Sequence, residues 1–263
     1  MEINDYIIGM VKAINKIFKR RRIIMSTEQI IKRELDEQDL DNAQRTQFDA
    51  LLYVENGGET PLPTWLEKKI LKRCAKYGFR FGEVVGTIAA SPIVAAEYAK
   101  KASRQSVAEK VQLDNFNKHG LKVEKLSKTG GSAMRLLDTG ELVFGSLGSR
   151  GVGTKSFDSR RGNDLILQKF TNEPGGAQDN QGRDAITYLK AANKYVANND
   201  SKFRFVAVLD GPYYRRNWAR FNQYANGKIL VENSDSYINK CKNEVIKKAV
   251  TRKSVNKVKE LTA

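Results

Sequence analysis

The sequence predicts an α/β protein in which helices flank a mixed central sheet, with a helical region in front of it. Two changes of pattern along the 263 residues support this fold class. Up to about residue 80, apolar residues recur at three- and four-residue spacing, as in amphipathic helices. From residue 104 onward, short apolar strands alternate with helices, which is typical of α/β domains. We therefore expect a helical, basic region at residues 1–80, serving specificity or dimerisation, and an α/β domain at residues 81–263.

The N-terminal region divides into several predicted helices. An amphipathic helix is expected at residues 4–25, and it ends in the basic cluster at residues 19–22. That cluster is either a solvated helix end or a surface that contacts phosphates. Its position after the apolar run does not fit a signal peptide. Further helices are expected at residues 26–36, 40–54 and 65–77.

The α/β domain is predicted from residue 104. A helix at residues 104–119 places Val107, Val111 and Phe116 on one face, with Glu109 close by. Gly120 then ends the helix. Strands and helices alternate beyond it. The strands are expected at residues 121–126, 142–144, 155–158, 164–170, 203–209 and 228–232, and the helices at residues 181–199, 215–225 and 234–250.

Charge and composition limit the class of partner. The formal net charge is +16 and the sequence pI is about 9.7, which points to a polyanion, with nucleic acid first and an anionic membrane second. A membrane partner is not expected, since no run of about 18 apolar residues occurs. Cys74, Cys241 and the single His119 are too few and too dispersed for a zinc site or a disulfide scaffold. This pattern indicates reduced thiols in a cytoplasmic protein.

The stretch at residues 154–181 is the candidate site. Residues 155–158 and 164–170 are expected to form a hairpin around a turn at residues 161–163, since Gly and Asn tolerate tight reversals. Such a hairpin would place Asp158 near Lys169. An acid and a lysine on adjacent strands are typical of metal-dependent phosphodiester cleavage. The alternative is a surface hairpin with a solvated carboxylate and a lysine whose stem covers apolar surface.

The order of these motifs resembles a known nuclease family. KSFD is followed by KFT, then by GGAQDNQ, then by the apolar strand FVAVLDGPYY. This order is similar to the PD-(D/E)xK nuclease core, and more narrowly to type II restriction endonucleases, over residues 104–215. The resemblance implies a restriction-endonuclease-like core. It also implies that Asp158 binds a metal, that Lys169 is the signature lysine, and that Glu109 on the preceding helix assists.

One position departs from the family pattern. Leu167, two residues before Lys169, stands where a second carboxylate is expected. If Leu167 points into the core, the register of the strand is expected to be locally irregular. Help for Asp158 would then come from Glu109, from Asp164, or from Gln178 and Asp179. For Gln178 and Asp179, capping of the helix that follows is an equal alternative. The candidate catalytic residues are Asp158, Lys169, Glu109 and Gln178, and the candidate metal ligands are Asp158, Glu109 and Asp179.

The resemblance implies a function. It implies Mg²⁺-dependent hydrolysis of both strands of double-stranded DNA at a short recognition sequence, by a homodimer with two active sites. Such an enzyme is part of a restriction-modification system, and a cognate DNA methyltransferase acts on the same site. Phosphate contacts are expected from Arg160, Arg161, Arg215 and Arg216. The alternatives are a structure-selective repair or junction-resolving nuclease and a non-catalytic nucleic-acid-binding protein.

Overall fold

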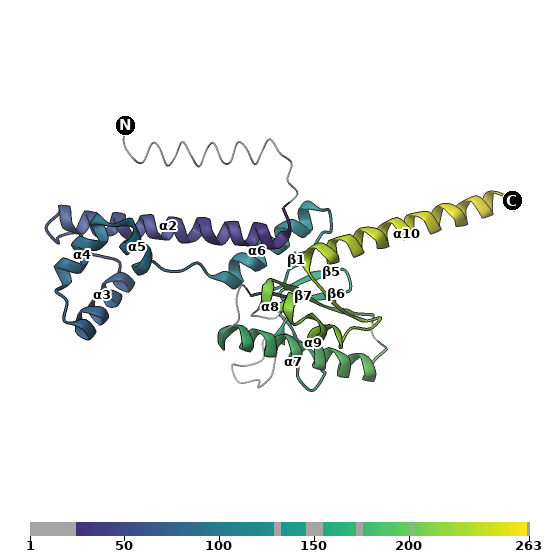
Figure 1. Cartoon of the computed structure of the whole chain (residues 1–263). Helices are drawn as coiled ribbons and strands as arrows, with labels where there is room; N and C mark the ends of the chain where they lie inside the picture. Colours follow the sequence, from purple (N-terminus) through teal and green to yellow (C-terminus); the bar gives the residue numbers. More distant parts are fainter. Residues whose placement is uncertain (1–24, 129–132, 146–154, 172–175, 201, 262–263) are drawn as a thin grey trace.

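A long helix, α2 (Thr27–Glu55), connects the two parts of the molecule (Figure 1). The computed structural model describes residues 25–128, 133–145, 155–171, 176–200 and 202–261. The helix expected at residues 4–25 therefore lies outside the described residues, apart from its last position. Helix α2 begins at a capping box formed by Ser26 and Gln29, which satisfies two N–H groups at the helix start. It continues without the predicted break at residues 37–39.

A helical arm surrounds the C-terminal half of α2. Its other helices are α3 (Thr64–Tyr77), α4 (Phe81–Ala90) and α5 (Pro92–Tyr98). Apolar side chains of all four helices form one buried cluster, which includes Ala50 of α2. Helices α4 and α5, which lie beyond the boundary expected at residue 80, bury their apolar faces within the arm. The helical region extends to about residue 100.

The second part of the molecule contains a five-stranded mixed sheet. Its strands are β1 (Glu124–Lys125), β5 (Ser159–Arg161), β6 (Asp164–Phe170), β7 (Arg204–Asp210) and β8 (Ile229–Glu232), and they lie side by side in that order. Strands β1, β5 and β6 pair antiparallel, whereas β6, β7 and β8 pair parallel. The predicted α/β class with a mixed central sheet and a helical N-terminal region is confirmed.

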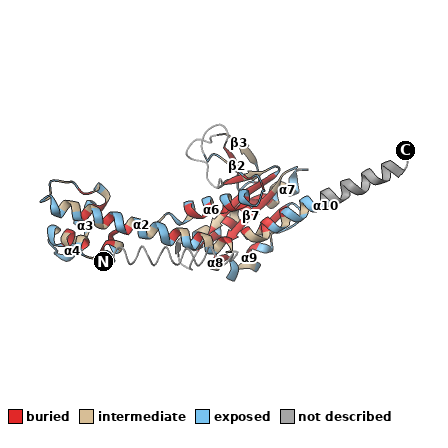
Figure 2. Ribbon diagram, turned by 90° about the horizontal axis from the view of Figure 1, so that it is seen from above, coloured by how far each residue is buried: buried red, intermediate tan, exposed pale blue. Residues whose placement is uncertain are grey.

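Helices cover both faces of this sheet, and buried residues concentrate between them (Figure 2). On one face, α6 (Arg104–Lys118) and α10 (Ser234–Leu261) pack against side chains that include Ile166 and Val206. On the other, α7 (Gly176–Asn198), α8 (Pro212–Arg216) and α9 (Trp218–Asn222) pack against Leu165, Leu167 and Phe205. Side chains alternate between faces along a strand, so β6 contributes to both cores.

The hairpin before the candidate site differs from the prediction. Strand β4 (Lys155–Ser156) pairs with β2 (Met134–Leu136), and with β3 (Leu142–Phe144) these form a second, three-stranded sheet. In the hairpin, β6 pairs with β5 and not with β4, through the predicted tight turn at Gly162 and Asn163. The chain changes sheets at Phe157, whose fully buried ring packs against Tyr188 and Phe205. The expected strand at residues 155–158 is therefore divided between two sheets.

The end of β7 gives a test of the fold. Gly211 has φ +107°, and a Cβ there would lie 2.0 Å from the backbone oxygen of Thr171. We predict that Gly211→Ala destabilises the protein by about 2 kcal/mol or more, because both the backbone conformation and the close approach exclude a side chain. Urea unfolding measures this change. Gly227→Ala is the matched control, since a Cβ there meets no atom within 4 Å and should shift stability by less than about 0.5 kcal/mol. Equal effects of the two changes would contradict the assignment.

Candidate functional site

The candidate site forms beside the start of β5, where β6 continues past the last residue that pairs with β5. Beyond Ile166, the edge of β6 that faced β5 pairs with no other strand among the described residues. Two side chains take the place of the missing strand. The Asp158 carboxylate accepts a hydrogen bond from the backbone N–H of Gln168 at 2.7 Å. The Gln105 amide of α6 donates to the backbone oxygen of Gln168 at 2.8 Å and accepts from the N–H of Phe170 at 3.4 Å. Buried backbone groups must be paired, which explains why polar side chains occur here.

Glu109 and Asp158 meet at one positive charge. Glu109 lies one turn after Gln105 on α6 and accepts a hydrogen bond from its amide at 3.0 Å. The Lys128 ammonium lies 3.0 and 3.1 Å from the two Glu109 oxygens and 2.9 Å from Asp158 Oδ1. The Asp158 side chain is only 5% exposed, whereas that of Lys128 is 46% exposed. The two carboxylates therefore converge on a single point that solvent reaches from the lysine side.

The environment of these groups changes their acidity. Burial raises the pKa of Asp158, and the negative charge of Glu109 raises it further. The hydrogen bond from Gln168 and the contact with Lys128 oppose this shift without cancelling it. For Lys128, partial burial lowers the pKa, but Asp158 and Glu109 outweigh burial and the pKa lies above its ordinary value. Asp158 therefore holds a charge in surroundings that disfavour it, and a cation offsets that cost.

A buried hydrogen-bond chain lies behind the site. The Ser159 hydroxyl donates to the Gln168 side-chain oxygen at 2.9 Å, and the Gln168 amide donates to the Gln112 oxygen at 3.2 Å. The Gln112 amide then donates to Asp210 at 2.6 Å. All four side chains are buried, and each glutamine uses its amide both as acceptor and as donor. The Gln168 amide also donates to the backbone oxygen of Glu109 at 3.4 Å. The chain thus connects β5, β6, α6 and the end of β7.

Asp210 is the end of that chain. Its carboxylate also accepts hydrogen bonds from the backbone N–H and the hydroxyl of Ser234, at the start of α10. Burial raises the pKa of Asp210, and the donors from Ser234 and Gln112 oppose the shift. Asp210, which was expected only as the end of an apolar strand, therefore attaches α10 to the sheet and sets the direction of every hydrogen bond behind the site.

The structure brings together some of the predicted site residues. Asp158 and Glu109 share the Lys128 ammonium, and Asp158 contacts the residue before Lys169. Lys169 itself is half-buried on the face of β6 that carries Leu167, and its side chain makes no hydrogen bond or ion pair with other described residues. The contact between the strands therefore joins Asp158 to the backbone of the residue before Lys169.

The predicted set of three metal ligands does not assemble. Asp179 is exposed in the first turn of α7 and accepts a hydrogen bond from the Tyr213 hydroxyl at 3.3 Å. Gln178 is in the same turn, and its side chain lies outside the described residues. Within the described parts of the chain, no group of three or more Asp, Glu, His or Cys side chains could hold a metal ion. Helix α7 also begins at Gly176, before the predicted start at residue 181, so GGAQ lies mostly within the helix.

Two expectations about β6 are wrong. Leu167 is buried in the core under α7, yet the register of β6 against β7 is continuous from Asp164 to Phe170. The irregularity lies instead on the other edge, where β5 stops. Asp164 cannot assist Asp158, because it lies at the opposite end of β6 and accepts two hydrogen bonds from Arg204 at 2.7 and 2.8 Å.

The predicted phosphate contacts fall into two groups. Arg215 and Arg216 are exposed on α8, where Arg215 forms an ion pair with Glu28 of α2 at 2.7 Å. Arg160 bonds the backbone oxygen of Gly162 and lies over the Phe203 ring. Arg161 is mostly buried near Asp164 and Glu244. Arg216 is therefore the most available of the four side chains for a nucleic acid.

Four residues of the site were not identified from the sequence. Lys128, Gln105 and Gln112 lie in stretches where nothing distinguishes them from solvated residues. Gln168 carried a signal, because it is a polar residue inside the apolar run at residues 165–170, and a buried amide needs partners.

Comparisons and hydropathy add no further assignment. None of the described helices is both long and apolar enough to span a membrane. Comparison of the chain with protein-family models, curated proteins and solved structures finds no match.

The raised pKa of Asp158 predicts how stability depends on pH. An acid whose pKa is higher in the folded state stabilises the fold fully below its unfolded pKa of about 3.9, and this contribution is lost as pH rises through the folded pKa. Asp158→Asn removes the titration but keeps an acceptor for the Gln168 N–H. We therefore predict that the melting temperature of the variant rises relative to the unmodified protein between pH 4 and pH 7.

Thermal melts at several pH values check this prediction. Glu59→Gln is the control, because Glu59 is exposed in the arm, and its difference from the unmodified protein should stay flat over the same range. A melting-temperature difference for Asp158→Asn that falls with rising pH would contradict the burial-dominated environment.

Proposed function

We propose that the chain is a Mg²⁺-dependent endonuclease that hydrolyses phosphodiester bonds of double-stranded DNA. The observation that carries the proposal is the convergence of Asp158 and Glu109 on one cation position at the edge of a mixed sheet. A pair of carboxylates built around one positive charge, in a chain of net charge +16, suits a metal ion and a polyanionic substrate.

The donor set of the site fits magnesium. Asp158 Oδ1 and both Glu109 oxygens face the Lys128 ammonium, while Asp158 Oδ2 is held by the Gln168 N–H. Mg²⁺ is usually bound through one or two carboxylates, with waters completing its shell. A third protein carboxylate is therefore not required. Asp158 and Glu109 would hold the ion, and Lys128 would have to move from the position that it occupies.

The residues around the pair have separate roles in this proposal. Magnesium would stabilise the charge that develops on the phosphoryl oxygens. The backbone of β6 orients Asp158, and Gln105 orients Glu109, so neither carboxylate depends on the metal for its position. Lys169, next to Gln168, would position or deprotonate the attacking water, as the resemblance to PD-(D/E)xK nucleases implies.

The more specific parts of the proposal rest on that resemblance. They are cleavage at a short recognition sequence, a homodimer that cuts both strands, and a place in a restriction-modification system with a cognate methyltransferase. Digestion of unmethylated phage DNA with Mg²⁺ tests them, since a site-specific enzyme gives discrete fragments. A structure-selective nuclease would instead nick only branched or damaged substrates.

One observation favours a second candidate, a nucleic-acid-binding protein without catalysis. The Lys128 ammonium already forms ion pairs with both Asp158 and Glu109, as it would in a structural ion cluster. This candidate predicts salt-sensitive DNA binding and no hydrolysis at any metal concentration.

Substitution of the three central residues tests the catalytic assignment. We predict that Asp158→Asn, Glu109→Gln and Lys169→Ala each lower the rate of Mg²⁺-dependent plasmid cleavage at least about 100-fold, the size of effect typical of lost catalytic groups. DNA binding in a gel-shift assay should be retained. Asp179→Asn is the control, because Asp179 bonds the Tyr213 hydroxyl and takes no part in the carboxylate pair. This variant should cleave DNA normally. Full cleavage by Lys169→Ala would remove Lys169 from the mechanism.

Lys128 gives a separate prediction, because it competes with a metal ion for the same carboxylates. We predict that Lys128→Ala lowers the Mg²⁺ concentration for half-maximal cleavage by roughly two- to fivefold, the range expected for a part-exposed ion pair. Lys125→Ala, a change of an exposed lysine in β1, should leave that concentration unchanged. Loss of cleavage in Lys128→Ala at every Mg²⁺ concentration would instead give Lys128 the role proposed for Lys169.

A further inference from the structure

A second candidate site lies at the opposite end of β6. A cavity of about 690 Å³ opens there, beside the turn that joins β5 to β6 and the starts of β7 and β8. Five basic side chains and two acidic ones line it, which leaves a net charge of +3. The basic side chains are those of Lys122, Arg161, Lys202, Arg204 and Lys228. None of these groups takes part in the site around Asp158.

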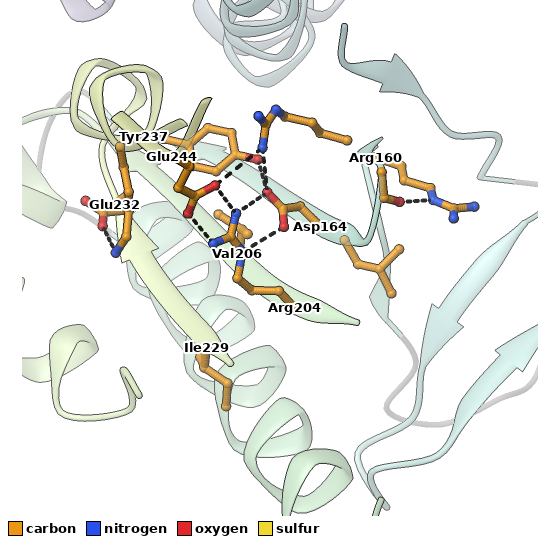
Figure 3. A network of polar contacts seen from close by, with 12 residues as sticks. Arg160, Asp164, Arg204, Val206, Ile229, Glu232, Tyr237 and Glu244 are labelled. Carbon is orange, nitrogen blue, oxygen red and sulfur yellow. Dashed lines mark hydrogen bonds and ion pairs between the residues drawn. The ribbon is translucent and has the colours of Figure 1, made fainter. Parts of the chain in front are cut away.

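Several residues that line this cavity belong to the network of ion pairs and hydrogen bonds drawn in Figure 3, which we call its floor. The Arg204 guanidinium donates to both oxygens of Asp164, at 2.7 and 2.8 Å, and to both oxygens of Glu244, at 2.5 and 3.2 Å. The Tyr237 hydroxyl also donates to Asp164, at 2.6 Å. Side chains fixed in this way lose little freedom when a ligand binds, which favours affinity.

Among the residues of the floor, Arg161 has N–H groups that its contacts with Asp164 and Glu244 do not use. Its contacts with Asp164 and Glu244 are long, at 3.5 and 3.9 Å, and both involve one nitrogen, Nη1. A guanidinium has five N–H donors, so most of those on Arg161 are not used by these two carboxylates. Only 20% of the Arg161 side chain is exposed, and the side chain lines the cavity. The Arg161 guanidinium is therefore reached more readily by an anion inside the cavity than by one on the surrounding surface.

Exposed lysine side chains add positive charge at the rim of the cavity. Lys122 and Lys202 are both exposed, and Lys202 lies 5.5 Å from the centre of the Phe203 ring. Lys122 has φ +53°, an uncommon conformation for a residue other than glycine. Strained backbone often marks functional positions. The ammonium groups of these lysines repel one another and the guanidinium groups of Arg161 and Arg204. A bound anion would reduce this repulsion.

We propose that this cavity binds a compact polyphosphate anion, the class that includes the triphosphate of a free nucleotide. Its volume is in the range of small-ligand sites, about 300–1,000 Å³. Arg161 and Arg204 are recessed, and a duplex, which presents its phosphates on a convex surface, contacts them poorly. Along β6 the cavity reaches Asp164, whereas Asp158 contacts the backbone of Gln168, four residues further on, a separation of roughly 13 Å at the usual rise per residue. The inference therefore does not depend on the proposed nuclease activity.

Calorimetric titration of the full chain with inorganic tripolyphosphate and with ATP, both without Mg²⁺, tests this inference. We expect saturable binding of both, weakened about tenfold or more in the double variant Lys122→Ala/Lys202→Ala through the loss of charge-assisted contacts. The matched control, Lys32→Ala/Lys190→Ala, removes the same charge from exposed positions on α2 and α7 and should bind like the unmodified protein. Asp158→Asn should also bind normally, which separates this result from any failure of the nuclease proposal.

Three outcomes would overturn the inference. One is the absence of tripolyphosphate binding by the unmodified protein. Another is an equal loss of binding in both double variants, since that indicates general charge. The third is unchanged tripolyphosphate binding in Lys122→Ala/Lys202→Ala with weaker binding of a duplex, since the cavity would then serve nucleic acid alone.

Discussion

The free edge of β6 is the constraint on which the candidate site depends. A strand that extends beyond its neighbour leaves backbone N–H and C=O groups without a partner. Burial of such unpaired groups lowers the stability of the fold. Here Asp158 and Gln105 supply the missing partners from outside the strand. Asp158 Oδ2 is held by the N–H of Gln168, and this hydrogen bond fixes the direction of Asp158 Oδ1. The same backbone requirement thus shapes the fold and aims a carboxylate at the Lys128 position.

Strand β6 also separates two polar regions of different character. At its start, Asp164 is enclosed by Arg204, Tyr237 and Glu244, and each carboxylate oxygen has a cationic or hydroxyl partner. At its end, Asp158 keeps a raised pKa and faces a half-exposed lysine. A satisfied carboxylate contributes to structure, whereas one in surroundings that disfavour its charge is a candidate for function. The two aspartates therefore lie in different environments.

The sequence predicted the parts of the structure that follow from local pattern. The class of fold, the sheet strands at residues 164–170 and 203–209 and the helix that carries Glu109 follow from apolar periodicity, because each buries a continuous face. The switch of sheets at Phe157 could not be predicted, since it depends on packing against Tyr188 and Phe205 from distant parts of the chain. Lys128 was missed for the same reason. The pair of Asp158 and Glu109 was proposed through resemblance, and the contacts that orient it emerge only in three dimensions.

The arm and the candidate site are mechanically connected. Ile31 and Leu35 of α2 pack on Phe170, two residues beyond the backbone N–H that binds Asp158. Thr27 at the start of α2 bonds Asp235 of α10 and accepts a hydrogen bond from Asn115 of α6. Helix α2 therefore contacts three elements around the site, and its 29 residues extend into the arm without a break. The start of α2 thus packs beside the end of β6, close to the carboxylates, while its C-terminal half belongs to the core of the arm.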